Sequence, residues 1–377
     1  MTDLPPNSLT HAKRLVVKIG AALLGDRDTG RVRSDWRESL ALDLVEARKR
    51  GQEVILVSSG ASALGRGLLG LPAGKVKLEH KQAAAAAGQV ILAQQYQSIL
   101  AHHDLVAAQI LITTQDTEDR RRHLNARTTL SALLNLGAIP VINENDTIAT
   151  SEIRFGDNDR LAARVAQMCS ADALVLLSDV DGLYTADPSM DKTERYIAHV
   201  PQITPAIEDI AGNSRSEYGS GGMVTKIAAA KIATAAGCHV LIGAGHHQRP
   251  LQQFYAKDGR YTWFEAVAEP STARKRWLIG HVDVAGRIMI DDGAVQALHQ
   301  GRSLLPAGIT RVDGQFDRGD MLAVVNHEGV EIARGLTAYS SADAQRIAGH
   351  QSQEIEALLG FAGREEMIHR DNLVMSG

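Results

Sequence analysis

The sequence has few cysteines, no excess of positive charge and no long apolar run, and these shortages exclude several classes of protein. Its two cysteines, Cys169 and Cys238, are far apart and flanked by apolar residues, so we expect buried thiols rather than a disulfide. No uninterrupted apolar stretch approaches the roughly 18 residues of a membrane span. The first residues, MTDLPPNSLTHAKR, lack the apolar core of a signal peptide. We therefore expect a cytoplasmic protein with no membrane partner.

The net charge is −4, which gives no general attraction for nucleic acid or for an anionic membrane surface. Two common phosphate-binding motifs are absent as well. No G-x-G-x-x-G follows the first predicted strand, and Gly74-Lys75, the only Gly-Lys pair, is not part of a Walker A loop. The first absence argues against a dinucleotide enzyme. A phosphate site in this chain would have to be of another type.

Strand and helix patterns alternate through the first 270 residues. The chain has 377 residues, of which 44% are hydrophobic and 22% charged, and this length suffices for two globular domains. The alternation indicates an α/β fold, an open and mostly parallel sheet sandwiched by helices. The predicted strands are residues 14–19, 53–57, 105–112, 138–142 and 173–177, and the predicted helices are residues 34–49, 81–100, 114–136 and 225–236.

A different pattern follows a linker at residues 270–275. Short apolar segments alternate with glycine turns, which predicts a small β-rich second domain over residues 275–363 and a C-terminal tail over residues 364–377. The second domain has 8 Lys and Arg against 11 Asp and Glu, a net charge of −3, so RNA binding by it is doubtful. Its predicted strands are residues 277–280, 286–290, 309–312, 321–326 and 330–339.

The densest polar chemistry follows the predicted strand at residues 138–142. The run Asn-Glu-Asn-Asp, residues 143–146, lies where ligands of open α/β sheets bind, beyond the carboxyl end of a strand. After a predicted hairpin at residues 147–155, the run Gly-Asp-Asn-Asp, residues 156–159, opens a helix. Facing each other, the two runs would offer carboxylates for an ammonium or a metal and an amide donor for a carboxylate, which suits an amino acid. Alternatively, Asp157 only caps a helix and the first run is a solvated turn.

Three other segments are candidates for binding phosphate or nucleotide. Lys18 lies in an otherwise apolar strand, which is costly unless its ammonium reaches an anion; the alternative is an edge lysine that extends to water. The Ser-Ser-Gly-Ala run at residues 58–61 joins a strand to a helix and offers N–H groups and hydroxyls, or is simply a serine N-cap. The polar loop at residues 178–188 could hold a nucleotide or be only a long connection.

Residues 219–226, Gly-Ser-Gly-Gly-Met-Val-Thr-Lys, carry the clearest phosphate signal. Three glycines let the backbone approach a ligand, and the predicted helix that follows directs its N-terminal N–H groups toward it. Lys226 adds a positive charge in the first turn. The segment therefore describes a phosphate cradle, and the alternative is a flexible glycine hinge.

Six segments of the first domain form an ordered set: VVKIG, SSGA, PVINEND, FGDND, LLSDVDGLYTADP and GSGGMVTK. Five more follow in the second: RKRW, GRIMIDDGA, GRSLLPAGI, GQFDRGD and RIAGHQSQEIEALLG. The first set resembles the amino-acid kinase family, and within it the bacterial glutamate 5-kinases. The second is similar to the PUA domain attached to those enzymes, which related kinases lack. The resemblance extends from Leu15 to Asp371 and implies an amino-acid kinase domain over residues 1–270 followed by a PUA domain.

The resemblance implies transfer of the γ-phosphoryl group of ATP, with Mg²⁺, to the side-chain carboxylate of L-glutamate, the first step of proline biosynthesis. It implies that Asp159 orients the catalytic lysines Lys18 and Lys226, and no side chain is assigned to the metal. The implied glutamate-binding residues are Ser59, Asp146 and Asn158. The implied ATP-binding residues are Lys18, Ser178, Asp179, Ser220, Gly221, Gly222, Met223, Val224, Thr225 and Lys226.

The residue types agree with this reaction. Phosphoryl transfer depends on in-line alignment and on positive charge around the transferred group. Two lysines, the N–H groups of a glycine loop and Mg²⁺ supply that charge. The acceptor is already a carboxylate at neutral pH, so no general base is required. Departures from the family pattern are Ala21 and Ala22, where hydroxyl residues are usual, and Ser178 and Ser220, where threonine is commoner.

The resemblance also implies several partners. These are proline as a feedback inhibitor at or overlapping the glutamate site, further copies of the chain in a dimer or tetramer, and glutamate 5-semialdehyde dehydrogenase as recipient of the unstable acyl phosphate. Two alternatives remain open. The acceptor could be aspartate, N-acetylglutamate or carbamate, or the chain could be an RNA-binding or regulatory protein with a vestigial site. The intact Lys18, Asp159 and Lys226 argue against the last of these.

Overall fold

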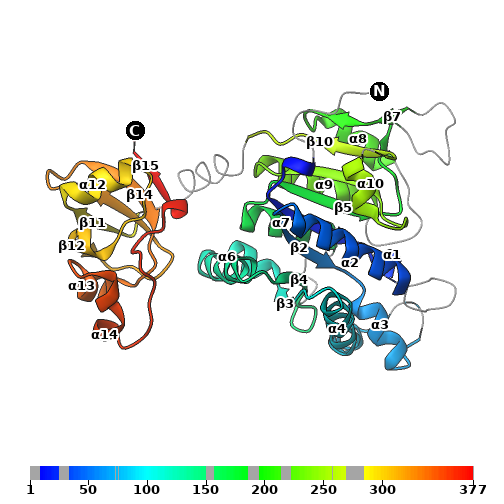
Figure 1. Cartoon of the computed structure of the whole chain (residues 1–377), viewed down its shortest axis with the longest axis horizontal. Helices are drawn as coiled ribbons and strands as arrows, with labels where there is room; N and C mark the ends of the chain where they lie inside the picture. The colour runs from blue at the N-terminus through cyan, green and yellow to red at the C-terminus, as the bar shows by residue number, and fades with distance from the viewer. Residues whose placement is uncertain are drawn as a thin grey trace. The chain divides into compact units, whose positions relative to one another are not determined.

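The computed structural model divides into two units, Met1–Pro270 and Ser271–Gly377 (Figure 1). Each unit has a hydrophobic core of its own, so we describe them one after the other. The structure describes residues 9–24, 34–72, 74, 76–149, 157–185, 195–213, 222–256, 258–268 and 284–376.

An eight-stranded sheet lies at the centre of the first unit. Its strands are β1 (Arg14–Ile19), β2 (Glu53–Ser58), β3 (Ala107–Ile112), β4 (Ile139–Glu144), β5 (Ala173–Ser178), β8 (His199–Val200), β9 (His239–Ala244) and β10 (Tyr261–Phe264). Across the sheet they follow the order β3-β4-β2-β1-β5-β9-β10-β8. The strands from β3 to β9 in this order run parallel, and β10 runs antiparallel to β9. This open, mostly parallel sheet confirms the predicted fold class.

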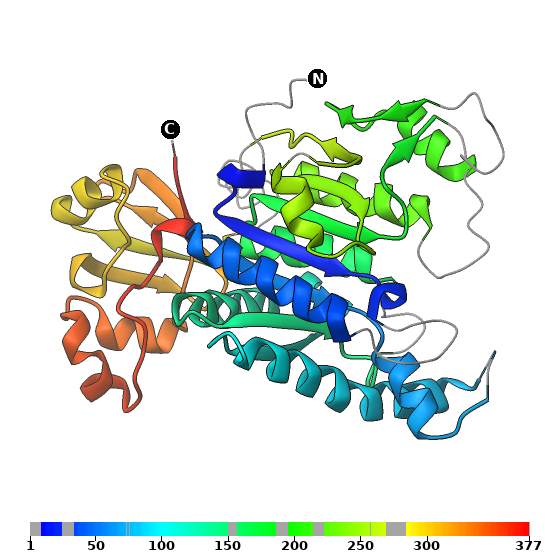
Figure 2. The same ribbon diagram turned by 45° about the vertical axis from the view of Figure 1, so that its right-hand side comes forward.

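Helices cover both faces of the sheet. One face packs against α6 (Arg120–Asn135), α7 (Asn158–Cys169), α8 (Pro205–Asn213) and α9 (Met223–Ala235). The other packs against α2 (Ser34–Lys49), α4 (Leu78–Ala101) and α10 (Pro250–Ala256). In Figure 2, α2 lies in front of the sheet and runs alongside β1. Side chains alternate between the faces along a strand. Val16 contributes to the first core, so Lys18, two residues on, is directed toward the face of α7 and α9.

The strand β4 extends further than the sequence pattern indicated. It runs through Asn143 and Glu144, and all of its residues are buried, so the first half of the polar run is not a solvated turn. A buried amide and a buried carboxylate need hydrogen-bond partners. Asp146 lies in the turn after the strand. Residues 147–148 also form turn, not the predicted hairpin strand, and residues 150–155 lie outside the described residues.

One long helix predicted over residues 114–136 is instead two, α5 (Thr114–Glu118) and α6. Asp119 separates them with an extended backbone conformation, φ −69° and ψ 121°. Its carboxylate accepts the N–H of Arg122 at 2.8 Å and so caps α6. The charged character of the segment hid this break, because the cap residue is one more acid in a charged run.

The helix α3 (Ala61–Leu68) crosses α4 at a distance that only glycine permits. A Cβ atom on Gly88 would lie 1.8 Å from the carbonyl oxygen of Ala61, and one on Gly65 would lie 1.7 Å from a backbone oxygen of α4. Ser59 lies two residues before the start of α3, and its neighbour Ser58 contacts α4 directly, with its hydroxyl 2.9 Å from that of Tyr96.

The second unit contains a five-stranded sheet. Its strands are β11 (Gly286–Ile290), β12 (Ile309–Gly314), β13 (Met321–Val325), β14 (Glu331–Leu336) and β15 (Leu373–Met375). Their order is β12-β11-β13-β14-β15; β11 and β13 run parallel and the other neighbours antiparallel. The strand pattern had not indicated the helices α12 (Asp292–His299), α13 (Ser341–Ile347) and α14 (Ile355–Leu359).

The last residues of the chain form part of the second unit and are not the separate tail expected over residues 364–377. The strand β15 pairs with β14, and Met367 and Ile368 are fully buried in the core. Pairing and burial tie a terminus to its domain. The strand predicted at residues 277–280 lies outside the described residues.

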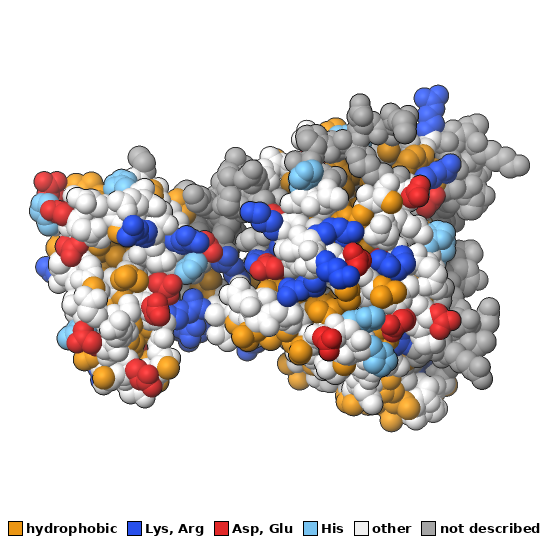
Figure 3. Space-filling view, in the orientation of Figure 1, with side chains coloured by type: hydrophobic (Ala, Val, Ile, Leu, Met, Phe, Trp, Pro, Cys, Tyr) orange, Lys and Arg blue, Asp and Glu red, His pale blue; other side chains and the backbone are white. Residues whose placement is uncertain are grey.

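The cysteines, the helices and one charged surface can be compared with what the composition predicted. Cys169 and Cys238 are buried and free, as expected. Of the helices that the structure describes, none combines the length and the apolar character needed to cross a membrane. Basic and acidic side chains are mixed over the surface where α2 lies (Figure 3), with Lys49 2.9 Å from Glu46. Charges on this face are therefore interspersed by sign.

Candidate active site

Two lysines meet one carboxylate at the carboxyl edge of the sheet. Lys18 belongs to β1, and its Nζ lies 2.6 Å from Oδ1 of Asp159. Lys226 belongs to the first turn of α9, and its Nζ lies 3.3 Å from Oδ2 of the same carboxylate. Thr225 donates its hydroxyl to that second oxygen at 3.1 Å. Three charged residues from distant parts of the sequence therefore form one cluster.

This lysine–carboxylate cluster is buried. Lys18, Lys226 and Asp159 are 8%, 5% and 1% exposed, and β1 lies between β2 and β5, so the alternative of a water-facing edge lysine is wrong. Burial alone would raise the pKa of the Asp159 carboxyl, but the two ammonium groups outweigh it and hold that pKa below its usual value. The carboxylate is therefore ionised at neutral pH. Two cations against one anion leave the cluster positive.

The N-termini of two helices place Asp159 and Lys226. Asp157 is the N-cap of α7, and its carboxylate accepts the N–H of Arg160 at 2.8 Å. Asp159 follows in the first turn, where the positive end of the helix dipole favours a carboxylate. Gly222 is the N-cap of α9, and no side chain of the described residues caps that helix. The first N–H groups of α9 can therefore face an anion.

A second cluster lies at the ends of β2 and β4. The Nδ2 of Asn158 donates to Oγ of Ser59 at 2.7 Å and lies 3.2 Å from the carbonyl oxygen of Ser58 and 3.3 Å from Oδ1 of Asn143. The structure thus brings together Ser59 and Asn158, two of the predicted glutamate residues. The next residue, Gly60, is the N-cap of α3 with a φ of 101° and no side-chain capping bond, so the serine N-cap alternative is wrong.

Asp146, the third predicted glutamate residue, is partly exposed in the turn that follows β4. The strands β4 and β2 are parallel neighbours, with Ile142 opposite Val57. Their carboxyl ends therefore lie side by side, which places Asp146 at the same edge of the sheet as Ser59.

The predicted nucleotide residues lie on the other side of β1. Ser178 ends β5, and its hydroxyl donates to Oδ1 of Asp179 at 3.0 Å. Because β5 pairs in parallel with β1, these two residues lie at the same edge as the lysines. Of the predicted glycine-loop residues, the structure describes Gly222, Met223, Val224, Thr225 and Lys226, whereas Ser220 and Gly221 lie outside the described residues.

Comparison with known proteins assigns both units. Residues 13–244 match the model of the amino acid kinase family, and residues 286–359 match that of the PUA domain. The chain belongs to the amino acid kinase family. It is 58% identical to the glutamate 5-kinase of Paramagnetospirillum magneticum over 98% of this chain and 99% of that protein. It is 53% identical to the one from Rhizobium rhizogenes (98% and 94%) and 54% to the one from Agrobacterium fabrum (100% and 96%). The resemblance stated from the sequence is confirmed.

This amino acid kinase contains polar residues beside the site that the sequence motifs did not single out. The Nδ2 of Asn143 donates to Oε1 of Gln89 at 2.8 Å, and the hydroxyl of Tyr96 lies 2.9 Å from that of Ser58. Gln89 and Tyr96 are both buried residues of α4, a helix that the sequence predicted without any role in the site. Their seven-residue spacing puts them on one helix face. That spacing was the signal that could have found them.

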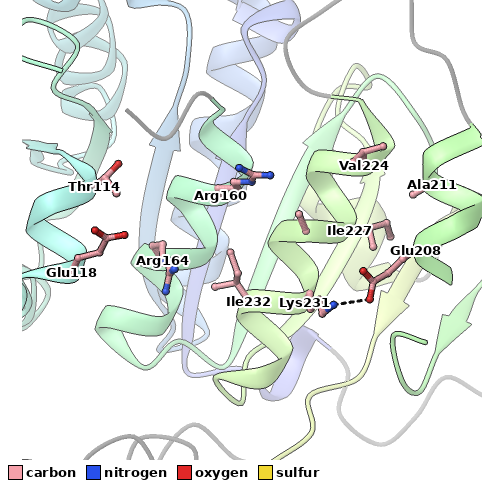
Figure 4. A pocket seen from close by; sticks show the side chains of 11 residues that line it. Thr114, Glu118, Arg160, Arg164, Glu208, Ala211, Val224, Ile227, Lys231 and Ile232 are labelled. Atoms are coloured by element: carbon pink, nitrogen blue, oxygen red, sulfur yellow. Dashed lines mark hydrogen bonds and ion pairs between the residues drawn. The ribbon is translucent and has the colours of Figure 1, made fainter. Parts of the chain in front are cut away.

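A hollow of about 570 Å³ opens elsewhere on the kinase unit, between α5, α7, α8 and α9 (Figure 4). Arg160 and Arg164 of α7 line it together with Lys231, which lies 2.7 Å from Glu208. Of the predicted ATP residues, only Val224 lines it. We place the candidate active site at the lysine–carboxylate cluster and not at this hollow, because the cluster lies at the carboxyl edge of the sheet.

Proposed function

We propose that this chain transfers the γ-phosphoryl group of ATP to the side-chain carboxylate of L-glutamate, giving L-glutamyl 5-phosphate for proline biosynthesis. The observation that supports this most is the cluster in which Lys18 and Lys226 meet the carboxylate of Asp159. The chain also matches, over nearly their whole length, relatives named glutamate 5-kinase.

The strand order supports a division of the site into two halves. Ser59, Asp146 and Asn158, at the ends of β2 and β4 and the start of α7, would hold glutamate. Ser178, Asp179 and residues 220–226, at the end of β5 and the start of α9, would hold ATP. The strand β1 lies between β2 and β5. Lys18, which belongs to β1, would therefore lie between the two halves, beside the phosphoryl group during its transfer.

In this proposal the lysines act on the charge of the transferred group. Lys18 approaches from β1 and Lys226 from the start of α9, and both would stabilise the charge that spreads over the phosphoryl oxygens. Asp159 positions the two ammonium groups before the nucleotide binds, so that little reorganisation is needed during the reaction. The glutamate carboxylate attacks without a general base, because it is ionised at neutral pH.

Mg²⁺ belongs to the proposal as the ion that accompanies ATP. Within the described residues, no group of three or more His, Cys, Asp and Glu side chains is arranged to hold a metal. In many kinases Mg²⁺ is held mainly by phosphate oxygens and water, with one or two carboxylates, and we propose such an ion here. Bound there, it would neutralise charge on the β- and γ-phosphate oxygens.

The direct test is trapping of the acyl phosphate. The protein is mixed with ATP, Mg²⁺, glutamate and hydroxylamine, and γ-glutamyl hydroxamate is measured. ADP release is measured in parallel with aspartate, N-acetylglutamate and carbamate as acceptors. Hydroxamate from glutamate, with much slower ADP release from the other acceptors, is expected. Absence of the hydroxamate, or a clear preference for another acceptor, would remove the proposal.

Proposals about partners follow from the same activity. Proline would act as a feedback inhibitor at or overlapping the glutamate site, which requires that inhibition weaken as glutamate increases. The chain would form a dimer or tetramer in the cytoplasm, measurable by sedimentation of the purified protein. Glutamate 5-semialdehyde dehydrogenase would receive the product. We do not expect RNA to be a partner of the second unit, and a salt-dependent RNA titration tests this.

A further inference from the structure

A stripe of polar side chains on α4 runs beside the acceptor half of the site. Gln82, Gln89 and Tyr96 recur every seven residues, so they lie along one face of the helix. Gln82 donates to the carbonyl oxygen of Ala149 at 3.2 Å, beyond the end of β4. With the contacts of Gln89 to Asn143 and of Tyr96 to Ser58, the stripe holds the ends of both acceptor-side strands.

The backbone fixes which way the Asn143 amide faces. The N–H of Glu144, which can only donate, lies 2.9 Å from the side chain of Asn143, so the atom there must be the oxygen Oδ1. The NH₂ group of Asn143 consequently faces Gln89 at 2.8 Å, and Gln89 must present its oxygen Oε1. Gln89 is 9% exposed, and a buried amide needs such a partner.

Neighbouring donors and acceptors also determine which way the side chains of Asn158 and Ser59 are oriented. The carbonyl oxygen of Ser58, which can only accept, lies 3.2 Å from the Asn158 amide, and Oδ1 of Asn143 lies 3.3 Å away. Two acceptors require the NH₂ group of Asn158 on that side. The Oγ of Ser59, 2.7 Å from this NH₂, therefore accepts and keeps its own proton for donation.

These hydrogen bonds determine which atoms of the acceptor half can donate to a ligand and which can accept from it. Ser59 offers an O–H donor, and Asn158 offers its Oδ1, which accepts no hydrogen bond from another described residue. Both side chains are partly exposed. A hydroxyl donor suits a carboxylate and an amide oxygen suits an ammonium, the two α-groups of an amino acid.

We propose that Gln89 is a positioning residue for the acceptor. Through Asn143 it holds in place the oxygen to which Asn158 donates its NH₂ group, so that Asn158 and Ser59 keep an oxygen acceptor and a hydroxyl donor in position for the α-ammonium and α-carboxylate of the substrate. The inference rests on the proposed function, because it takes glutamate as the ligand of this half. Without the Gln89 oxygen, the NH₂ group of the buried Asn143 loses the partner that holds it, so Asn143 and the Asn158 amide that donates to it shift from these positions.

The test compares three variants. Gln89→Met keeps an unbranched side chain of similar length but removes the acceptor oxygen. Gln89→Glu keeps an acceptor oxygen toward Asn143. Gln94→Met makes the same change at an exposed position of the same helix and serves as the control. For each we measure kcat, the KM values of glutamate and ATP, and the melting temperature.

We expect Gln89→Met to raise the KM of glutamate about tenfold, with the KM of ATP changed less than about twofold. Gln89→Glu should recover most of this loss, and Gln94→Met should match the wild type. Equal losses in Gln89→Met and Gln89→Glu, or a lower melting temperature without a change in the KM of glutamate, would overturn the inference. If methionine prevents folding, Gln89→Ala provides the same comparison. A wild-type protein that does not phosphorylate glutamate would instead refute the proposed function, whatever the variants do.

Discussion

The two halves of the candidate site are built in different ways. In the acceptor half, directional hydrogen bonds of 2.7–3.3 Å join Ser59, Asn158 and Asn143 and end on the buried Gln89. In the nucleotide half, the described residues offer the N-terminal N–H groups of α9 and a short contact between Ser178 and Asp179. The lysine–carboxylate cluster lies between them. The acceptor half depends mainly on the orientation of side-chain amides and hydroxyls, and the nucleotide half on backbone N–H groups and on the positive charge of the adjoining cluster.

This difference matches the chemistry of the two ligands that we propose. An amino acid presents one ammonium and carboxylates at fixed positions, so its recognition depends on which atom each side chain turns toward it. A triphosphate presents many equivalent oxygens, and positive charge attracts them over a wide range of angles. Changes in the acceptor half should therefore alter mainly the affinity for glutamate. Changes in the charged groups should alter mainly the rate of transfer.

The largest expected effect comes from removing a charge. Lys226→Ala should lower kcat by about 10²–10³-fold, because the ammonium would act mainly on the transition state. The KM of glutamate should change by less than about threefold. Lys231→Ala, on the same helix but exposed and paired with Glu208 at 2.7 Å, is the control and should change neither value. Equal, modest changes in kcat and KM for Lys226→Ala would mean that the lysine only binds, and the contrast between the halves would fail.

The next effect concerns how α4 supports the acceptor half. Gly88→Ala would place a Cβ 1.8 Å from the carbonyl oxygen of Ala61, so α3 and α4 must separate. We expect a loss of about 3 kcal/mol in the free energy of unfolding, measured by urea denaturation. Gly67→Ala is the control: no atom in the described part of the chain lies within 4 Å of a Cβ there, and the variant should be as stable as the wild type or up to about 1 kcal/mol more stable. Similar stabilities for the two variants would contradict the close crossing.

A smaller change, confined to binding, should follow from Asp146→Ala. The turn after β4 would lose a carboxylate that we assign to glutamate, so the KM of glutamate should rise about tenfold while kcat changes by less than about threefold. Thr147→Ala, at the exposed neighbouring position, should leave the KM of glutamate unchanged. Calorimetric titration of glutamate would check the affinity directly, and an unaltered value for Asp146→Ala would remove this residue from the acceptor half.

The sequence predicted the framework of the site because that framework follows from local patterns. The strand Arg14–Ile19 is a short apolar run, and a lysine within it is costly enough to indicate an anion site. The polar residues at the ends of β2, β4 and β5 could be placed at one edge because parallel strands align their carboxyl ends. The roles of Lys18, Lys226 and Asp159 came from the resemblance to a family, not from these patterns.

The spacing of Gln89 and Tyr96 could have indicated a shared polar face on α4, but their partners could not be predicted, because these contacts join residues far apart in the chain. Gln89 and Asn143 are separated by 54 positions, and nothing local to either residue indicates the other. The burial of Glu144 was missed because polar residues after a strand usually mark a turn. Likewise, only the tertiary structure decides that residues 373–375 complete the sheet of the second unit.

The smallest expected effect separates support of the site from contact with the ligand. Burial raises the pKa of Tyr96 to about 12, although its hydrogen bond to Ser58 opposes this shift. Since folding disfavours the phenolate, this residue's contribution is complete below its unfolded pKa of about 10 and is lost as the pH rises through about 12. Tyr96→Phe should cost about 1 kcal/mol in the free energy of unfolding near pH 8, and its deficit relative to the wild type should shrink toward pH 11.

Tyr255→Phe provides the matched comparison for that change. Burial also raises the pKa of Tyr255 to about 12, and its hydroxyl donates to Gln52 at 2.6 Å, outside the acceptor half. Both variants should show the same dependence of stability on pH. Only Tyr96→Phe should raise the KM of glutamate, by about twofold to threefold, because Ser58 adjoins Ser59. An equal KM of glutamate in the two variants would mean that the Tyr96 hydroxyl stabilises the fold but does not position the residues of the acceptor half. The polar stripe on α4 would then act on the site through Gln89 and Gln82 alone.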